Sequence, residues 1–112
     1  MSQTKSTRIV LITCGNLVEA RRIAATLVRK RLAACVSTIL GPLQSVYRWK
    51  GRVEIASEHL VMIKTVNKHL PAIEAEIKRL HSYDVPEILA LPVLWGSSDY
   101  LEWLDQSTKP AK

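Results

Sequence analysis

The residues of this sequence best suited to bind a metal ion are its two cysteines and three histidines. Thiolate and imidazole both suit copper, with Cu(I) favouring sulfur and Cu(II) favouring nitrogen. We predict Cys14 and His81 as metal ligands, with Asp84 and Glu87 as further oxygen donors. The alternative is that Cys14 is a small buried thiol and that His81 ends a helix, where its cation suits the helix dipole.

The other residues with chemical potential are aromatic or charged and lie in two short stretches. Together they could line a ligand cleft between subunits, with aromatic walls, a cation and carboxylates: Tyr47, Arg48, Trp49, Tyr83, Asp84 and Glu87. Interface packing explains the aromatic members equally well, because interface cores are enriched in aromatic residues. His59 and His69 have no partner at a ligand spacing, and we expect both at the surface.

Catalysis is not indicated. The sequence has no nucleophile–base pair, glycine-rich phosphate loop or paired-carboxylate motif. A cysteine close to a histidine, without a third group to orient them, is weak evidence for a reaction. We therefore expect a protein that is not an enzyme and that requires no cofactor, although copper or another divalent cation could bind.

The elements that must position these residues are organised around a long β-hairpin, predicted from Ala34 to Thr65 with its turn at Lys50-Gly51. Apolar or aromatic residues alternate with charged ones on both sides of the turn, which is typical of half-buried strands. Glycine tolerates the positive φ of a tight turn. Gly41-Pro42 predicts a bulge or bend in the first arm. Because each arm exceeds the usual strand of about five or six residues, we expect free edges that another chain can use.

The other elements follow from apolar periodicity and capping signals. They are a strand over 8–13, a helix capped at Asn16 with Glu19 reaching back, a second helix capped at Asn67, a buried-type strand over 88–94, and a short helix capped at Ser97 or Ser98. The first helix is expected to end near Arg31. The order βαββαβ predicts an α+β fold, the ferredoxin-like plait, with an antiparallel sheet, a long central hairpin and a short C-terminal helix.

In that plait the strands lie in the order fourth, first, third, second, with two helices on one face of the sheet. Cys14, the first helix start at Asn16 and the loop 81–87 then meet at one end of the sheet. This is why Cys14 and His81 form the predicted pair. Cys35 falls near the opposite end, roughly 15–20 Å away, which is too far for an intrachain disulfide.

Length and composition predict one domain over residues 1–112, with a folded core over 8–105 and tails at 1–7 and 106–112. No apolar run reaches the roughly 18 residues of a membrane span, and the polar start lacks the apolar core of a signal peptide. We therefore expect a cytoplasmic protein, or the mature core of a targeted eukaryotic form, with free thiols and no membrane partner. The net charge of +6 is assigned to solvated helix faces and tails.

Specific nucleic-acid binding is not expected, although RNA-recognition modules share this plait. Those modules stack bases on aromatic residues of the two central strands. Here the central strands are expected over 8–13 and 59–65, and neither contains Phe, Tyr or Trp.

Several separate motifs, in matching order, resemble the CutA family of divalent-cation tolerance proteins. They are RLAACV from Arg31, VYRWKG from Val46, IKT from Ile63, HSYDVPEI from His81, ALPV from Ala90 and YLEWL from Tyr100. The resemblance covers the chain from Ile9 to Leu104. It implies a ferredoxin-like protomer in a tight homotrimer whose long hairpins extend the sheets between subunits.

The resemblance also implies a function in tolerance to copper and other divalent metals, with no established reaction. Copper sites proposed in bacterial relatives use a cysteine inside the first strand and a His-His pair ending the second helix. Here Ile12 occupies the strand position and Leu80-His81 replaces the pair, so only His81 carries over and Cys14 substitutes from a neighbouring position. The alternative is a trimeric signalling or scaffold protein that senses a small molecule or partner protein at the subunit cleft.

Overall fold

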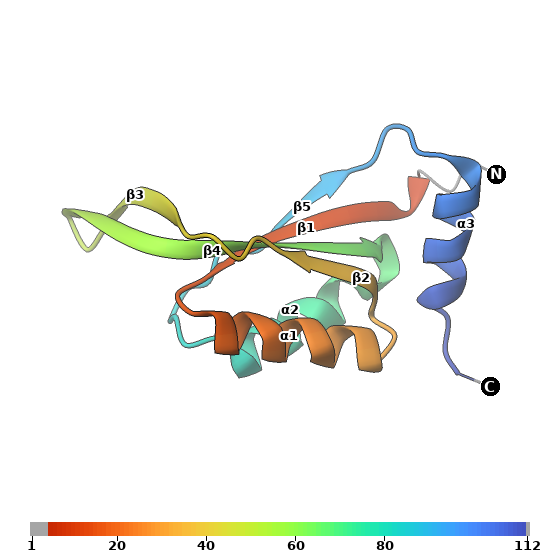
Figure 1. The fold of residues 1–112 in the computed structure, drawn as a ribbon, viewed down its shortest axis with the longest axis horizontal. Coiled ribbons are helices and arrows are strands. Elements are labelled where there is room, and N and C mark those ends of the chain that lie inside the picture. The colour runs from red at the N-terminus through yellow and green to blue at the C-terminus, as the bar shows by residue number, and fades with distance from the viewer. Residues whose placement is uncertain (1–4, 112) are drawn as a thin grey trace.

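A five-stranded antiparallel sheet with two helices on one face forms the body of the protein (Figure 1). The computed structural model describes residues 5–111. The elements are β1 (Thr7–Cys14), α1 (Leu17–Arg29), β2 (Ala33–Thr38), β3 (Leu43–Trp49), β4 (Arg52–Val66), the 3-10 turn η2 (Asn67–His69), α2 (Leu70–Leu80), β5 (Leu89–Pro92) and α3 (Ser98–Ser107). The strands lie in the order β2-β4-β1-β5, and β3 also pairs with β4. The predicted ferredoxin-like plait is therefore confirmed.

The long hairpin is formed by β3 and β4, which pair from Leu43 opposite Glu58 to Trp49 opposite Arg52. Lys50 and Gly51, at the predicted turn, both have positive φ, at 51° and 77°. Two positive values at the centre of a two-residue loop match the right-handed twist of the paired strands. The first arm is interrupted over residues 39–42, as Gly41-Pro42 predicts, so that β2 and β3 are separate strands along β4. Figure 1 shows the hairpin extending well beyond the helices.

The capping predictions for the helices are only partly right. Asn16 caps α1, because its Oδ1 accepts from the Glu19 backbone amide at 2.8 Å. Glu19 does not reach back to complete a capping box; its Oε1 accepts from the backbone amide of Ser82 at 2.9 Å. Asn67 opens a 3-10 turn and makes no side-chain cap for α2. This helix forms without that cap and buries Ile73 and Ile77 in the apolar core.

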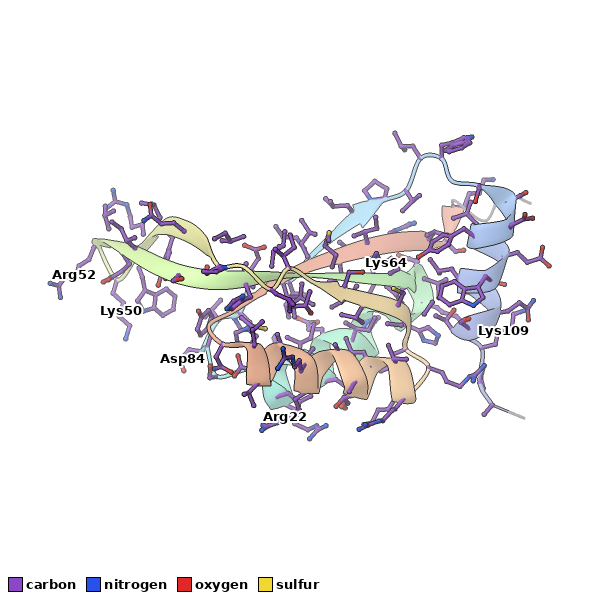
Figure 2. The ribbon with its side chains drawn as sticks, in the orientation of Figure 1. Arg22, Lys50, Arg52, Lys64, Asp84 and Lys109 are labelled. Atoms are coloured by element: carbon purple, nitrogen blue, oxygen red, sulfur yellow. The ribbon has the colours of Figure 1, made fainter. Side chains whose placement is uncertain are left out.

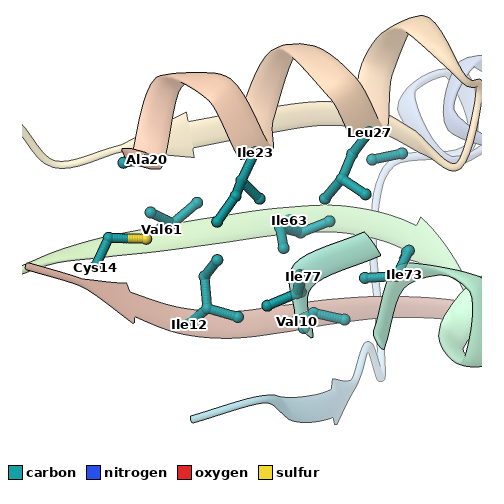
Figure 3. Packing of buried hydrophobic residues seen from close by; sticks show 11 residues of the cluster. Val10, Ile12, Cys14, Ala20, Ile23, Leu27, Val61, Ile63, Ile73 and Ile77 are labelled. Carbon is teal, nitrogen blue, oxygen red and sulfur yellow. The ribbon is translucent and has the colours of Figure 1, made fainter. Parts of the chain in front are cut away.

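The apolar core lies between the sheet and the two helices, as Figure 3 shows. Ile12 of β1, Ile23 of α1, Ile63 of β4 and Ile77 of α2 are completely buried. Their spacing follows the period of two in the strands and of three to four in the helices. This layer holds β1 and the two helices in a fixed relation, which in turn positions the side chains at the strand ends.

Two boundary predictions are wrong. Ser107 still belongs to α3, and Thr108 is 1% exposed with its hydroxyl bonded to the Leu104 carbonyl. The segment up to Thr108 therefore belongs to the folded body, whereas residues 109–111 are exposed. At the other end, β1 already begins at Thr7, and Ser6 accepts from the Asn67 amide through its carbonyl. The predicted tail residues 1–4 and 112 lie outside the described part of the chain.

The last strand is shorter and more exposed than its sequence predicts. β5 covers only Leu89–Pro92, and all four of its residues are exposed. The apolar run 88–94 predicts a buried strand instead. Within residues 5–111, α1 and α2 lie on one face of the sheet and leave the opposite face of β5 uncovered (Figure 1). Within residues 5–111, no helix is both long and apolar enough to cross a membrane.

Candidate metal centre and adjoining acidic cavity

Cys14 and His81 come together at one end of the sheet, as the topology predicts. Cys14 is the last residue of β1, and Figure 3 shows it at the end of the buried layer. His81 directly follows α2, and its backbone amide donates to the Ile77 carbonyl. Glu19, in the first turn of α1, completes a group of three. One ligand atom from each of these three side chains lies within 4.8 Å of the other two.

The His81 ring is fixed by hydrogen bonds on both nitrogens. Nε2 lies 2.7 Å from the Thr13 carbonyl, which can only accept, so this nitrogen carries the proton. Nδ1 accepts from the Tyr83 backbone amide at 3.1 Å and lies 3.6 Å from Glu19 Oε2. Metal-ligating histidines are usually held in this way, with one N–H on a carbonyl and the other nitrogen free of hydrogen. Nδ1 is therefore the nitrogen that faces the other two groups.

Cys14 is fully buried and uncharged. Burial, and secondarily the carboxylates of Glu19 and Glu58, raise the pKa of its thiol from 9.0 to about 12. A free thiol in this position is inert at neutral pH, because the thiolate is the nucleophile and the metal ligand. Only a cation close enough to stabilise the thiolate would release its proton.

The Glu19 carboxylate is the group that the site leaves unsatisfied. The residue is 8% exposed, and its Oε2 has no hydrogen-bond partner among residues 5–111. An unpaired buried carboxylate oxygen is costly unless a hydrogen bond, an opposite charge or a metal ion compensates it. Here no lysine or arginine of the described chain reaches it, and the neighbouring His81 Nδ1 has no proton to donate.

Beside this group lies a cavity of about 450 Å³ with a second buried carboxylate in its wall. Glu58 of β4 is 5% exposed and accepts from the Tyr83 hydroxyl at 2.8 Å. Burial by itself raises the pKa of Glu58, but hydroxyl donors from Ser45, Tyr83 and Thr13 outweigh it and hold the pKa below its ordinary value. The same burial, together with Glu58, raises the pKa of Tyr83. Glu58 is therefore ionised and Tyr83 is a permanent donor to it.

Most of the predicted cleft residues surround this cavity or the smaller one that adjoins it. Tyr47, Tyr83 and Glu87 line the larger cavity, while Trp49 and Asp84 line the smaller one with the same two tyrosines. These residues of one chain already share a site without a neighbouring subunit. Arg48 lines neither cavity and is exposed on the hairpin. Figure 2 shows Asp84 in the loop close to the start of α1, and Lys50 and Arg52 at the tip of the hairpin.

The remaining polar candidates do not join the metal group. His59 and His69 are half-buried rather than at the surface, and each ring nitrogen approaches a backbone carbonyl, of Ile39 and Thr108 respectively. Cys35 is free, like Cys14, and lies 3.9 Å from the Lys64 ammonium. Among the described residues, Cys14, Glu19 and His81 are the one group of three that could hold a metal ion.

Sequence reasoning missed Glu19 and Glu58, the two buried carboxylates. The sequence assigns Glu19 to a helix cap, a role that its position after Asn16 predicts well. Glu58 lies in the alternating pattern of β4, one residue before His59, which pairs with Cys14. That register is the available signal, because it places Glu58 at the Cys14 end of the sheet.

Comparison with known proteins gives one consistent result. The sequence model of the family described as "CutA1 divalent ion tolerance protein" matches residues 8–107. The chain is 46% identical over 100 residues to the divalent-cation tolerance protein CutA of Thermus thermophilus, covering 89% of this chain and 96% of that protein. It is 41% identical over 108 residues to the chloroplastic protein CutA of Arabidopsis thaliana, covering 96% of this chain and 59% of that protein. The chain therefore spans about three fifths of this plant relative.

Solved structures agree with the sequence comparison. The structure of the divalent cation tolerance protein Cut A1 from Thermus thermophilus superposes with a TM-score of 0.89 at 44% identity, covering 92% of this chain and 99% of that one. The structure of the periplasmic divalent cation tolerance protein CutA from Archaeoglobus fulgidus gives 0.88 at 36% identity, with 92% and 99% coverage.

Proposed function

This chain belongs to the CutA1 family of divalent ion tolerance proteins, and from that premise we propose that it binds a divalent metal ion, copper in particular, without catalysing a reaction. The observation that supports metal binding is the group formed by Cys14, Glu19 and His81, in which a buried carboxylate oxygen has no hydrogen-bond partner among residues 5–111. A divalent cation in this position would supply the missing positive charge.

The donor set suits a borderline metal better than a hard one. Sulfur and imidazole nitrogen with a single carboxylate match copper and zinc, whereas magnesium and calcium prefer oxygen ligands throughout. Among divalent first-row metals, copper binds a given set of such ligands most tightly. His81 is already held by its Nε2–H, so only Nδ1 must exchange the Tyr83 amide for the metal.

The test is calorimetric titration of the metal-free protein with Cu²⁺, Zn²⁺ and Mg²⁺. We expect one saturable copper site per chain, weaker zinc binding and no magnesium binding. The variants Cys14→Ser and Glu19→Gln each remove a ligand and should weaken copper binding at least about tenfold, since losing even a partner that orients a ligand typically costs about 10–100-fold. Cys35→Ser and Glu76→Gln are matched controls, because Cys35 lies outside the group and Glu76 pairs with Lys30 and Arg79.

Unchanged copper affinity in both Cys14→Ser and Glu19→Gln would refute this site. A thermal unfolding curve of each variant, measured without metal, separates lost binding from lost folding. If a variant does not fold, His81→Gln offers a further test at the same site.

We also propose that the protein is a homotrimer, as its resemblance to the family implies. The support is apolar surface that stays exposed in the described part of the single chain, residues 5–111. Leu94 and Trp95, after β5, are 89% and 81% exposed, and Val53 and Ile55 on the hairpin are also exposed. Exposed apolar surface of this extent is typical of an interface. Light scattering at micromolar concentration should give three times the chain mass of 12.6 kDa, and a monomer mass would contradict the trimer.

A cytoplasmic location is proposed from the two free thiols, which persist where disulfides are kept reduced. Relatives are named chloroplastic and periplasmic, so the family is not confined to one compartment. Fractionation of the source cells tests the location, and recovery in a secreted or organellar fraction would contradict it.

A further inference from the structure

The acidic cavity beside the metal group has features that metal binding does not explain. Its lining and that of the adjoining cavity include three carboxylates, from Glu58, Asp84 and Glu87, and no lysine, arginine or histidine. The chain as a whole carries a net charge of +6. A cavity whose charged lining residues are all acidic attracts cations, because low-dielectric walls focus the field.

The deepest of these carboxylates is fixed as an anion. Glu58 is almost fully buried, and none of the ion pairs in the described chain involves it. The Tyr83 hydroxyl donates to it at 2.8 Å, and the hydroxyl groups of Ser45 and Thr13 help to hold its pKa low, but no lysine or arginine of the described chain pairs with it. Buried charges in proteins are usually paired. A cation bound in the cavity would therefore serve as the counter-charge of Glu58.

The same hydroxyl groups make the cavity less suited to a metal ion than to an organic ammonium ion. A metal ion needs oxygen lone pairs directed at it, and hydroxyl donors already compete for most of the about four lone-pair positions of the Glu58 carboxylate. An organic ammonium ion needs only the charge and a surface to contact. The rings of Tyr47 and Tyr83 line the cavity and supply such a surface, since aromatic faces attract cations and form the cages that bind quaternary ammonium groups.

We propose that the cavity lined by Tyr47, Glu58, Tyr83 and Glu87 is a binding site for a small organic ammonium ion. Its volume of about 450 Å³ falls within the range of about 300–1,000 Å³ usual for small-molecule sites. The inference is independent of the proposed metal function, because neither Cys14 nor Glu19 lines this cavity.

The experiment is a titration of the intact, isotope-labelled protein followed by amide chemical shifts. The probes are tetramethylammonium and n-butylammonium chloride, with sodium chloride at equal ionic strength and the neutral tert-butanol as controls. We expect saturable shifts at the amides of Tyr47, Tyr83 and Glu87 with at least one ammonium probe and with neither control. No saturable shift with either ammonium probe, or equal shifts with tert-butanol, would overturn the proposal.

Two exposed residues allow the site to be altered without disturbing the core. Glu87→Gln removes one carboxylate and Tyr47→Leu removes one ring, and each should weaken probe binding about tenfold, the size expected of a single charge or ring contact in a half-open site. Glu102→Gln on α3 removes the same charge elsewhere on the surface and should leave probe binding unchanged. Equal affinity in Glu87→Gln and Glu102→Gln would refute a role for the cavity.

The same variants separate this site from the metal centre. Cys14→Ser should weaken copper binding and leave ammonium binding unchanged, whereas Glu87→Gln should weaken ammonium binding and leave copper binding unchanged. Loss of ammonium binding in Cys14→Ser would overturn the proposal, because it would place the probe at the metal group instead.

Discussion

Replacing Tyr83 with phenylalanine tests whether the Glu58 carboxylate is a buried anion held by hydroxyl groups. The substitution removes one oxygen and keeps the ring, which packs against His81 with ring centroids 4.6 Å apart. The lost bond is 2.8 Å long and ends on a carboxylate that is 5% exposed. Hydrogen bonds to charged groups contribute about 1.5–3 kcal/mol. Because the Ser45 and Thr13 donors remain, we expect the free energy of unfolding of Tyr83→Phe to fall by about 2 kcal/mol at pH 7.

The pH dependence gives a second, sharper expectation. The folded protein holds the pKa of Glu58 below its ordinary value of 4.5, although burial alone acts in the opposite direction. A depressed folded pKa contributes stability that is present above the unfolded value and is lost as the pH falls through the folded one. Removing the Tyr83 donor raises the folded pKa. The difference in free energy of unfolding between wild type and Tyr83→Phe should therefore be largest at neutral pH and should decrease below about pH 4.5.

Urea unfolding at a fixed protein concentration, repeated from pH 3 to pH 8, measures both effects. Tyr100→Phe is the matched control, because Tyr100 lies on the surface of α3 at 43% exposure and its hydroxyl has no hydrogen bond to the described residues. The free energy of unfolding of Tyr100→Phe should differ from that of wild type by no more than about 0.5 kcal/mol. A loss in Tyr83→Phe no larger than in the control, or one that does not depend on pH, would refute the buried-anion interpretation of Glu58.

Further predictions concern the thiol, the turn and the core. With its pKa raised from 9.0 to about 12, Cys14 should react with iodoacetamide at pH 8 about 1,000-fold more slowly in the folded than in the unfolded protein; mass spectrometry of timed digests measures this, and equal rates would contradict burial of the thiol. Because metal binding must displace the Cys14 proton, copper affinity should rise about tenfold per pH unit between pH 6 and 8, and a flat calorimetric profile would exclude the thiolate as a ligand. Lys50→Asn should stabilise the hairpin by about 0.5–1 kcal/mol, because asparagine tolerates the positive φ better; urea unfolding tests this, and destabilisation would contradict it. Ile77→Ala leaves a cavity in the completely buried layer and should cost about 2–5 kcal/mol, whereas a loss below about 1 kcal/mol in the same assay would show that the layer collapses to fill it.

The order of the elements could be predicted because it depends on short-range patterns. The alternation on either side of Lys50-Gly51 predicts the hairpin, and the structure shows both turn residues at positive φ. The same holds for the Asn16 cap. Because crossover connections between parallel strands are almost always right-handed, few topologies are compatible with this order of elements. The ferredoxin-like topology brings Cys14 and His81 together from positions far apart in the chain.

The partners of individual polar side chains could not be predicted in this way. Glu19 satisfies the pattern of a capping box, yet it bonds to Ser82, which is 63 residues away in the sequence. The choice depends on how closely α1 and the loop after α2 pack, and local spacing carries no information about that. The Glu58 network has the same origin, since its donors come from β1, β3 and the loop after α2.

By itself, the sequence determined the family, the plait and the pair of candidate metal ligands, because each depends on residue types and periodicity along the chain. Only the tertiary structure decided which carboxylates are buried, which atoms lack partners, and that Thr108 packs on the body while β5 stays exposed. These properties depend on which segments cover one another in three dimensions. The electrostatic environment of a side chain depends on which distant segments bury it. The chemical properties of the site can therefore be read only from the packed structure.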